Sequence, residues 1–194
     1  MYAGTVETTK QYPQSHNLFY WLAKNITLDS KAPLIIWIQG EPGVSAMRGL
    51  FVQNGPLTTD GSSVGLAPSG TSLTEVGDVL YLDQPVGTGF SFGLSDTDVA
   101  TSLDQVSHEF INFLSSFLGM YPEYASPRKV FLMGEDFAGK YLPRFAKEIN
   151  DFTEKGGSLN LKALFIGNPA STVQKINSYK TARALSLVDS SNFG

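Results

Sequence analysis

The sequence contains no cysteine among its 194 residues. Disulfides, zinc–thiolate sites and cysteine nucleophiles are therefore excluded for this chain. Histidine is nearly as scarce, since His16 and His108 are the only two. Charged residues make up only 16% of the chain and the net charge is −4. This balance supplies no basic tract for nucleic acid or for an anionic membrane surface.

Long hydrophobic runs are also missing, because no apolar stretch approaches the roughly 20 residues that span a bilayer. The first residues alternate like a strand and lack the basic start, apolar run and cleavage site of a signal peptide. We therefore expect a chain that is cytosolic, already processed, or part of a longer protein. The single sequon, at Asn25, would matter only in the secretory path. The hydrophobic content of 42% is enough for one globular domain over residues 1–194.

Short apolar runs indicate where the buried strands lie. Residues 33–38, 79–82, 129–133 and 161–167 are continuous apolar segments, typical of strands buried on both faces. Residues 3–9 and 17–22 predict an opening pair of strands, and 54–75 predict a long surface loop. Apolar spacing of three and four predicts helices over 103–117 and 141–149, and a last helix is expected near Thr172. This alternation predicts an α/β fold with a mainly parallel sheet.

Three unusual turns follow predicted strands, at residues 39–43, 83–89 and 134–139. In open α/β sheets, ligands bind at the carboxyl ends of the strands. The last turn contains Gly134, Asp136 and Gly139 in the pattern Gly-x-Asp-x-x-Gly. It is close to the Gly-x-Ser-x-Gly elbow, in which the central side chain stands exposed at the start of a helix.

Several segments in a fixed order carry a resemblance that covers nearly the whole chain. They are Asn17–Trp21, Pro33–Gly43, Gly49–Phe51, Asn54–Pro56, Leu82–Ser91, Tyr121–Tyr124, Gly134–Tyr141 and Ile166–Asn168. In these segments the chain resembles the N-terminal part of the serine carboxypeptidases, especially the vitellogenic-like carboxypeptidases. The resemblance implies an α/β-hydrolase fold, truncated here before its last strands. It also implies enzymes that remove C-terminal residues with a Ser-His-Asp triad, in lysosomal, vacuolar or secreted settings.

The resemblance places the family's nucleophile on Asp136 and its oxyanion hole on the backbone N–H groups of Phe137 and Glu41. A carboxylate that attacked an amide would form an anhydride and expel a poor leaving group, and losing a serine nucleophile costs about 10⁶ in rate. The triad's histidine and aspartate lie beyond this chain's end in the family. We expect His16 in a turn and His108 on a helix surface, neither placed to serve Asp136.

The resemblance also assigns the grip on the substrate's terminal carboxylate to Gln39, Gly40, Gln53 and Glu135. Gln53 stands where the family usually has glutamate, and Glu41 stands where it has glycine. Glu41, Glu135 and Asp136 are expected to cluster and to repel a peptide carboxylate. Two alternatives remain open: Asp136 could attack an epoxide or displace halide, and the carboxylates could bind a metal ion or an amine.

The leading hypothesis is a non-catalytic carboxypeptidase-like domain, without cofactor or metal, that is retained for binding or assembly. A second hypothesis is an enzyme with residual or altered hydrolysis, and a third is a fragment of a longer homologue. Because the family's sheet continues past this chain, an apolar edge would be exposed. We therefore expect a protein partner: a companion chain, a second copy or a larger assembly.

Overall fold

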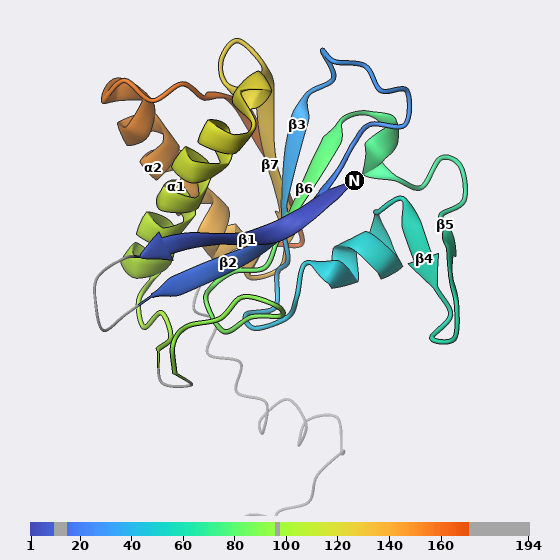
Figure 1. Ribbon diagram of the computed structural model, residues 1–194, viewed down its shortest axis with the longest axis horizontal. Coiled ribbons are helices and arrows are strands. Elements are labelled where there is room, and N and C mark those ends of the chain that lie inside the picture. The colour runs from blue at the N-terminus through green and yellow to red at the C-terminus, as the bar shows by residue number, and fades with distance from the viewer. Residues whose placement is uncertain (10–14, 96–97, 171–194) are drawn as a thin grey trace, which may run out of the picture.

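The computed structural model describes residues 1–9, 15–95 and 98–170, which build one six-stranded mixed sheet (Figure 1). Its order is β1-β2-β6-β3-β7-β8, and β6, β3, β7 and β8 run parallel while β1 and β2 are antiparallel. The strands are β1 (Tyr2–Thr9), β2 (His16–Ala23), β3 (Leu34–Ile38), β6 (Asp78–Leu82), β7 (Lys129–Glu135) and β8 (Asn160–Gly167). The predicted α/β fold with a mainly parallel sheet is confirmed.

The central strands lie where the sequence analysis predicted them. They could be predicted because both of their faces are covered. Every residue of β3 and of β6 is buried, which explains the unbroken apolar sequences of residues 34–38 and 79–82. Strand β2 instead alternates buried and half-buried residues, as a strand with one covered face should. The apolar runs therefore located these strands, and the alternating pattern located the antiparallel pair.

Two helices cover one face of the sheet, on the left in Figure 1. Helix α1 (Leu103–Met120) begins after Ser102, whose Oγ accepts from the backbone N–H of Gln105 at 3.2 Å. Helix α2 (Ala138–Glu154) packs beside it, with the rings of Phe110 and Phe145 stacked 4.0 Å apart. No helix among the described residues is long and apolar enough to cross a membrane. The helix expected near Thr172 lies outside those residues.

Residues 54–75 were expected to form only a surface loop, and this prediction is wrong in part. They contain a small hairpin of β4 (Leu57–Thr59) and β5 (Val64–Leu66), followed by the short helix η2 (Leu73–Glu75). The turn forms at Asp60, whose carboxylate accepts the backbone N–H groups of Ser62 and Ser63 at 2.9 and 2.8 Å. By bonding to backbone N–H groups two and three residues further on, Asp60 stabilises the turn that connects the two short strands.

The second face of the sheet is covered unevenly. Over β3 and β6 it is closed by Ala46 and Met47 and by Leu50 of the π-helical turn η1 (Gly49–Gln53). Over β7 and β8 the described residues leave it partly open, and Phe165 is 52% exposed. The ring of Phe165 contacts that of Phe131 at 6.0 Å. Strand β8 is also the last strand of the sheet, so its outer edge is unpaired within the described part of the chain.

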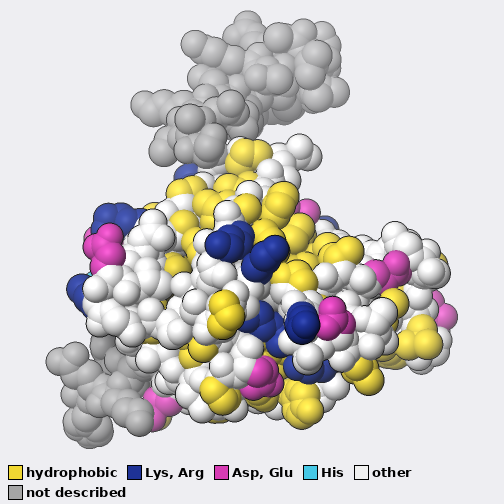
Figure 2. Space-filling model, turned by 90° about the horizontal axis from the view of Figure 1, so that it is seen from above, with side chains coloured by type: hydrophobic (Ala, Val, Ile, Leu, Met, Phe, Trp, Pro, Cys, Tyr) yellow, Lys and Arg dark blue, Asp and Glu magenta, His cyan; other side chains and the backbone are white. Residues whose placement is uncertain are grey.

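The open face continues onto the amino ends of the strands. Figure 2 looks onto this end of the molecule and shows hydrophobic side chains exposed between Lys and Arg. A groove of about 650 Å³ lies here, lined by Ser30, Lys31, Pro33, Glu123, Ala125, Pro127, Arg128, Lys129 and Phe131. The amino ends of β3 and β7 therefore border a surface that is both apolar and basic.

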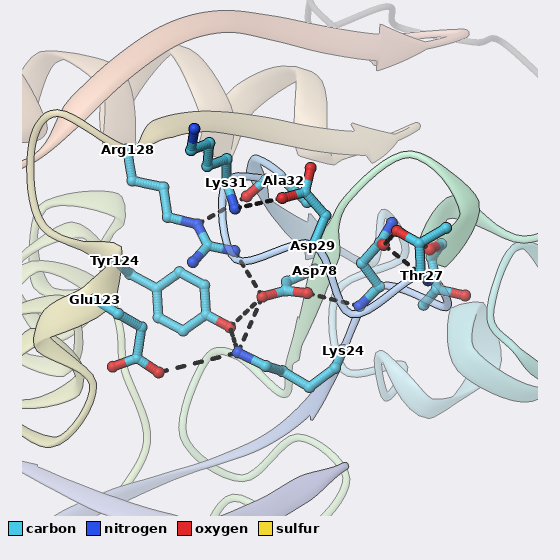
Figure 3. A network of polar contacts seen from close by, with 11 residues as sticks. Lys24, Thr27, Asp29, Lys31, Ala32, Asp78, Glu123, Tyr124 and Arg128 are labelled. Carbon is cyan, nitrogen blue, oxygen red and sulfur yellow. Dashed lines mark hydrogen bonds and ion pairs between the residues drawn. The ribbon is translucent and has the colours of Figure 1, made fainter.

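Beside this groove, a buried carboxylate joins four segments of the chain (Figure 3). Asp78 is 2% exposed, and its carboxylate accepts from Tyr124 Oη at 2.6 Å, Arg128 Nη2 at 2.8 Å and the backbone N–H of Asn25 at 2.6 Å. Lys24 Nζ lies 3.1 Å from the same carboxylate. The side-chain amide of Asn25 is buried and donates to Thr74, so the folded chain does not present the acceptor amide of this sequon to solvent.

Candidate active site at the carboxyl edge of the sheet

The turn after β3 and the turn after β7 are in direct contact. A Cβ atom on Gly40 would lie 2.1 Å from the carbonyl oxygen of Glu135 and 2.9 Å from Cβ of Asp136. Real Cβ atoms do not approach backbone this closely, so only glycine fits at position 40. The absence of a side chain at Gly40 thus brings residues 39–41 against the residue at the centre of the elbow.

Asp136 adopts the backbone conformation that an elbow requires. Its φ is +47°, in the left-handed region that costs a non-glycine residue about 1–2 kcal/mol. The turn is held by the N–H of Asp136 donating to Gly167 O at 3.0 Å, and by its carbonyl accepting from the N–H groups of Gly139 at 3.0 Å and Ala170 at 2.8 Å. The side chain is exposed just before α2, at the positive end of the helix dipole. The predicted elbow geometry is therefore present, whereas the role of Asp136 stays a prediction.

Three of the four positions assigned to substrate binding meet beside the elbow through their side chains. Glu135 Oε1 accepts from Gln39 Nε2 at 2.8 Å and from Gln53 Nε2 at 2.6 Å. Gln39 is 4% exposed and is oriented in turn by Trp37, whose Nε1 donates to Gln39 Oε1 at 3.2 Å. Because position 53 carries an amide, Glu135 accepts hydrogen bonds from two N–H donors. A glutamate at position 53 would instead have to share a proton with Glu135.

Glu41 does not join Glu135 and Asp136 as expected. Its exposed carboxylate instead forms an ion pair with the exposed guanidinium of Arg48. The described residues contain no group of three or more His, Cys, Asp or Glu side chains that could hold a metal ion. The prediction that three carboxylates cluster here is thus wrong for Glu41, because Glu41 pairs with the positive charge of Arg48. The sequence analysis did not identify Arg48. The backbone N–H of Glu41 keeps its assigned role as a prediction.

The turn after β6 supports the site without offering a free reactive group. Asp83 is fully buried and accepts from Ser45 Oγ at 2.7 Å and from the backbone N–H groups of Ala46 at 2.7 Å and Phe90 at 2.9 Å. Burial raises the pKa of Asp83 above its ordinary value, although these three donors act in the opposite direction. Asp83 therefore connects residues 45–46 to Phe90 and stabilises the turns at this edge of the sheet.

The expectation that His16 lies in a turn is wrong, because His16 is the first residue of β2 and is fully buried. Strand β2 is separated from β7 by β6 and β3, and three strand spacings amount to about 14 Å. Both ring nitrogens of His16 already contact carboxylates. His108 is exposed on α1, as expected. Within the described residues, the Asp136 carboxylate has no hydrogen-bonding or ion-pairing partner and so no imidazole base.

Comparison with known proteins agrees with this geometry. A family model described as serine carboxypeptidase matches residues 1–192. The pheromone-processing carboxypeptidase KEX1 of Candida glabrata is 36% identical over 174 residues, which is 87% of this chain and 23% of that protein. The probable serine carboxypeptidase CPVL of Pongo abelii is 35% identical over 176 residues, covering 90% and 36% respectively. The chain thus spans about a quarter to a third of the length of these relatives.

Solved structures show the same fold. The crystal structure of Kex1ΔP, a prohormone-processing carboxypeptidase from Saccharomyces cerevisiae, matches with a TM-score of 0.75 and 30% identity, over 98% of this chain and 43% of that one. The ferulic acid complex of Est1E from Butyrivibrio proteoclasticus matches with a TM-score of 0.51 and 19% identity, over 83% of this chain and 52% of that one. The second match concerns the fold alone.

Proposed function

The chain belongs to the serine carboxypeptidase family, and we propose that it is a member that binds another polypeptide and does not hydrolyse peptides. The observation that carries this proposal is Asp136, which occupies the elbow in the conformation of a nucleophile without the chemistry of one. An alkoxide attacking an amide leaves an ester that water can cleave, whereas a carboxylate would leave a reactive anhydride. A partner that supplied a histidine and an aspartate would still meet no serine at this position.

The substitutions around Asp136 support the same proposal. Glu41 stands where an oxyanion-hole glycine is usual, so a side chain that is ion-paired with Arg48 occupies a position that the family leaves without one. Gln53 stands where glutamate is usual, so Glu135 is held by two amides. The site thus departs from the family pattern at three positions. Three departures favour a site that is no longer used for catalysis over an active enzyme with one replaced residue.

A serine-reactive phosphonate tests the absence of an activated serine. We expect no label on this chain near pH 5, because the position where the probe would form its bond carries a carboxylate. A serine carboxypeptidase with an intact triad, treated in parallel, should be labelled to completion and shows that the probe is active. A phosphonate adduct mapped to any serine of this chain would contradict the proposal.

The binding half of the proposal rests on the open face over β7 and β8. Phe165 is a large aromatic residue that is 52% exposed, and it lies in β8, whose outer edge pairs with no other described strand. Edges and apolar faces of this kind favour pairing with another chain. A second polypeptide that covers β8 would bury this surface and continue the sheet.

Sedimentation of natively purified protein tests this association. We expect a complex heavier than the 21.0 kDa chain, and we expect Phe165→Asp to weaken it by about tenfold or more, because a charge is then placed in an apolar contact. Leu66→Asp is the matched control, since Leu66 is 82% exposed on the separate β4–β5 hairpin. A monodisperse 21.0 kDa species, or equal effects of the two variants, would contradict the assignment of this face.

A second candidate function is retained or altered hydrolysis in a longer or two-chain protein. The strained backbone of Asp136 favours it, because binding alone does not require a non-glycine residue at φ +47°. In this case a companion segment would supply the histidine base, and Asp136 would attack an epoxide or a carbon–halogen bond.

A further inference from the structure

A buried histidine joins three segments that are far apart in the sequence. His16 is fully buried at the start of β2, with its Nδ1 2.6 Å from Glu109 Oε1 and its Nε2 2.6 Å from Asp98 Oδ1. Glu109 belongs to α1 and is 3% exposed. Asp98 lies in the segment that leads into that helix. We call His16, Asp98 and Glu109 the clasp.

The two short contacts of the clasp require two bridging protons. An imidazolium ion carries an N–H on each nitrogen, whereas neutral imidazole carries only one and presents a lone pair on the other. Neutral His16 between two carboxylates would therefore place a lone pair against an oxygen at 2.6 Å. The doubly bonded arrangement exists only when the group holds one more proton, on His16 or on one of the carboxyls.

Among the described residues, no Lys or Arg forms an ion pair with the clasp. On α1, Glu109 faces His16 and its second oxygen, Oε2, is buried without a partner. On β1, Thr8 Oγ1 donates to the carbonyl of His16 at 3.2 Å, and the neighbouring Glu7 is acidic. Within the described part of the chain, the extra proton is thus the positive charge that compensates the two carboxylates.

The clasp fixes the segment that connects the site-bearing edge to α1. This segment leaves the turn after β6 and runs along β2, where Asn17 and Phe92 exchange two backbone hydrogen bonds of 2.9 Å. Further on, the carboxylate of Asp98 accepts from the backbone N–H of Leu94 at 3.4 Å and bonds to His16. Release of Asp98 would free residues 93–95 and 98–100 from β2 and from α1.

We propose that the clasp is a proton-dependent latch, which holds residues 93–95 and 98–100 against β2 and α1 in acid and releases them as the pH rises. This inference does not depend on whether the elbow hydrolyses any substrate. It assigns to the buried histidine a regulatory role over a segment that begins at the edge of the candidate active site.

The direction of the pH effect follows from the electrostatics. Burial acts to lower the pKa of His16, but its hydrogen bonds and charge interactions with Asp98 and Glu109 outweigh burial and raise that pKa above 6.5. Burial raises the pKa of Glu109 above 4.5. Raised pKa values in the folded state stabilise it fully below the ordinary values, and this stabilisation is lost as the pH rises through the raised ones. The hydrogen bond from His16 lowers the pKa of Asp98 below 3.8, so its contribution persists in mild acid.

Amide hydrogen exchange of the intact protein, with any companion chain retained, tests the latch. After correction for the intrinsic rate, we expect protection of residues 93–95 and 98–100 to fall about tenfold or more between pH 6 and pH 9. His16→Gln should make this protection independent of pH, because glutamine does not titrate. His108→Gln is the matched control and should retain the native profile, since His108 is exposed on α1. Identical profiles for the two variants would overturn the proposal.

A measurement on the unmodified protein covers the case in which His16→Gln does not fold. Nitrogen-15 chemical shifts of the His16 imidazole should show the ring still protonated above pH 6.5, the ordinary pKa of histidine. If the His16 ring has lost its proton by pH 6.5, the latch is wrong.

Discussion

Peptide hydrolysis by this chain should lie about 10⁶-fold below that of a serine carboxypeptidase with an intact triad, and Asp136→Ser alone should not restore it. A serine hydroxyl needs a histidine to remove its proton, and the two histidines of this sequence are occupied or distant. His16 is bound to two carboxylates, and His108 is exposed on α1. The measurement is turnover of a blocked dipeptide near pH 5, with any companion chain retained.

Asp136→Asn is the control, because it keeps the size of the side chain and removes its charge. The native protein, Asp136→Asn and Asp136→Ser should all remain at the rate of a blank. Turnover by the native protein that disappears in Asp136→Asn would mean that Asp136 is a nucleophile. Turnover that appears only in Asp136→Ser would mean that a companion supplies the histidine, which would favour a recently inactivated enzyme over a long-established binding protein.

Asp78→Asn should lower the free energy of unfolding by about 3–5 kcal/mol, because it removes the anion that Lys24 and Arg128 share. The Arg128 side chain is only 7% exposed, so its charge would remain in a poorly solvated position. The loss should appear as a lower midpoint in urea unfolding followed by circular dichroism.

The matched control for Asp78→Asn is Asp60→Asn, which alters the exposed turn of the β4–β5 hairpin. Equal stabilities of the two variants would contradict the role assigned to Asp78. The network should also withstand acid: burial acts to raise the pKa of Asp78, but the N–H of Asn25, Tyr124 and Lys24 outweigh it and lower that pKa below 3.8. A lowered pKa means that the stabilisation is present above 3.8 and is lost only as the pH falls through the lower folded value. The clasp and this network therefore respond to opposite ends of the pH range.

The strands and the elbow could be predicted because their causes are local. Residues 34–38 and 79–82 are buried on both faces, so hydrophobicity alone marks them. The elbow is marked by Gly134 and Gly139, where a Cβ atom would lie 2.5 Å from Ile38 O and 2.6 Å from Pro169 Cβ. Where two backbone segments approach this closely, the sequence has glycine, and such glycines can be recognised from the sequence alone.

The pairing of charges could not be predicted, because it depends on which segments the sheet brings together. His16 meets Asp98 and Glu109 only after β2, the following loop and α1 have packed. Glu41 turned toward Arg48, seven positions along the chain. One signal was available for the clasp: Glu109 lies on the apolar face of its helix, between Val106 and Phe110. A carboxylate in such a position needs a buried partner.

The order of the strands determines when the protein can fold during synthesis. Strand β3 lies near the middle of the sheet and pairs Leu34 with Asp78 on one side and with Val130 on the other. A ribosome adds roughly 5–20 residues per second, so β7 emerges about 5–20 seconds after β3. During that time the fully apolar strand β3 lacks its partner β7, whereas the local β1–β2 hairpin can already form. The nascent chain should therefore need chaperone protection until β7 has left the ribosome.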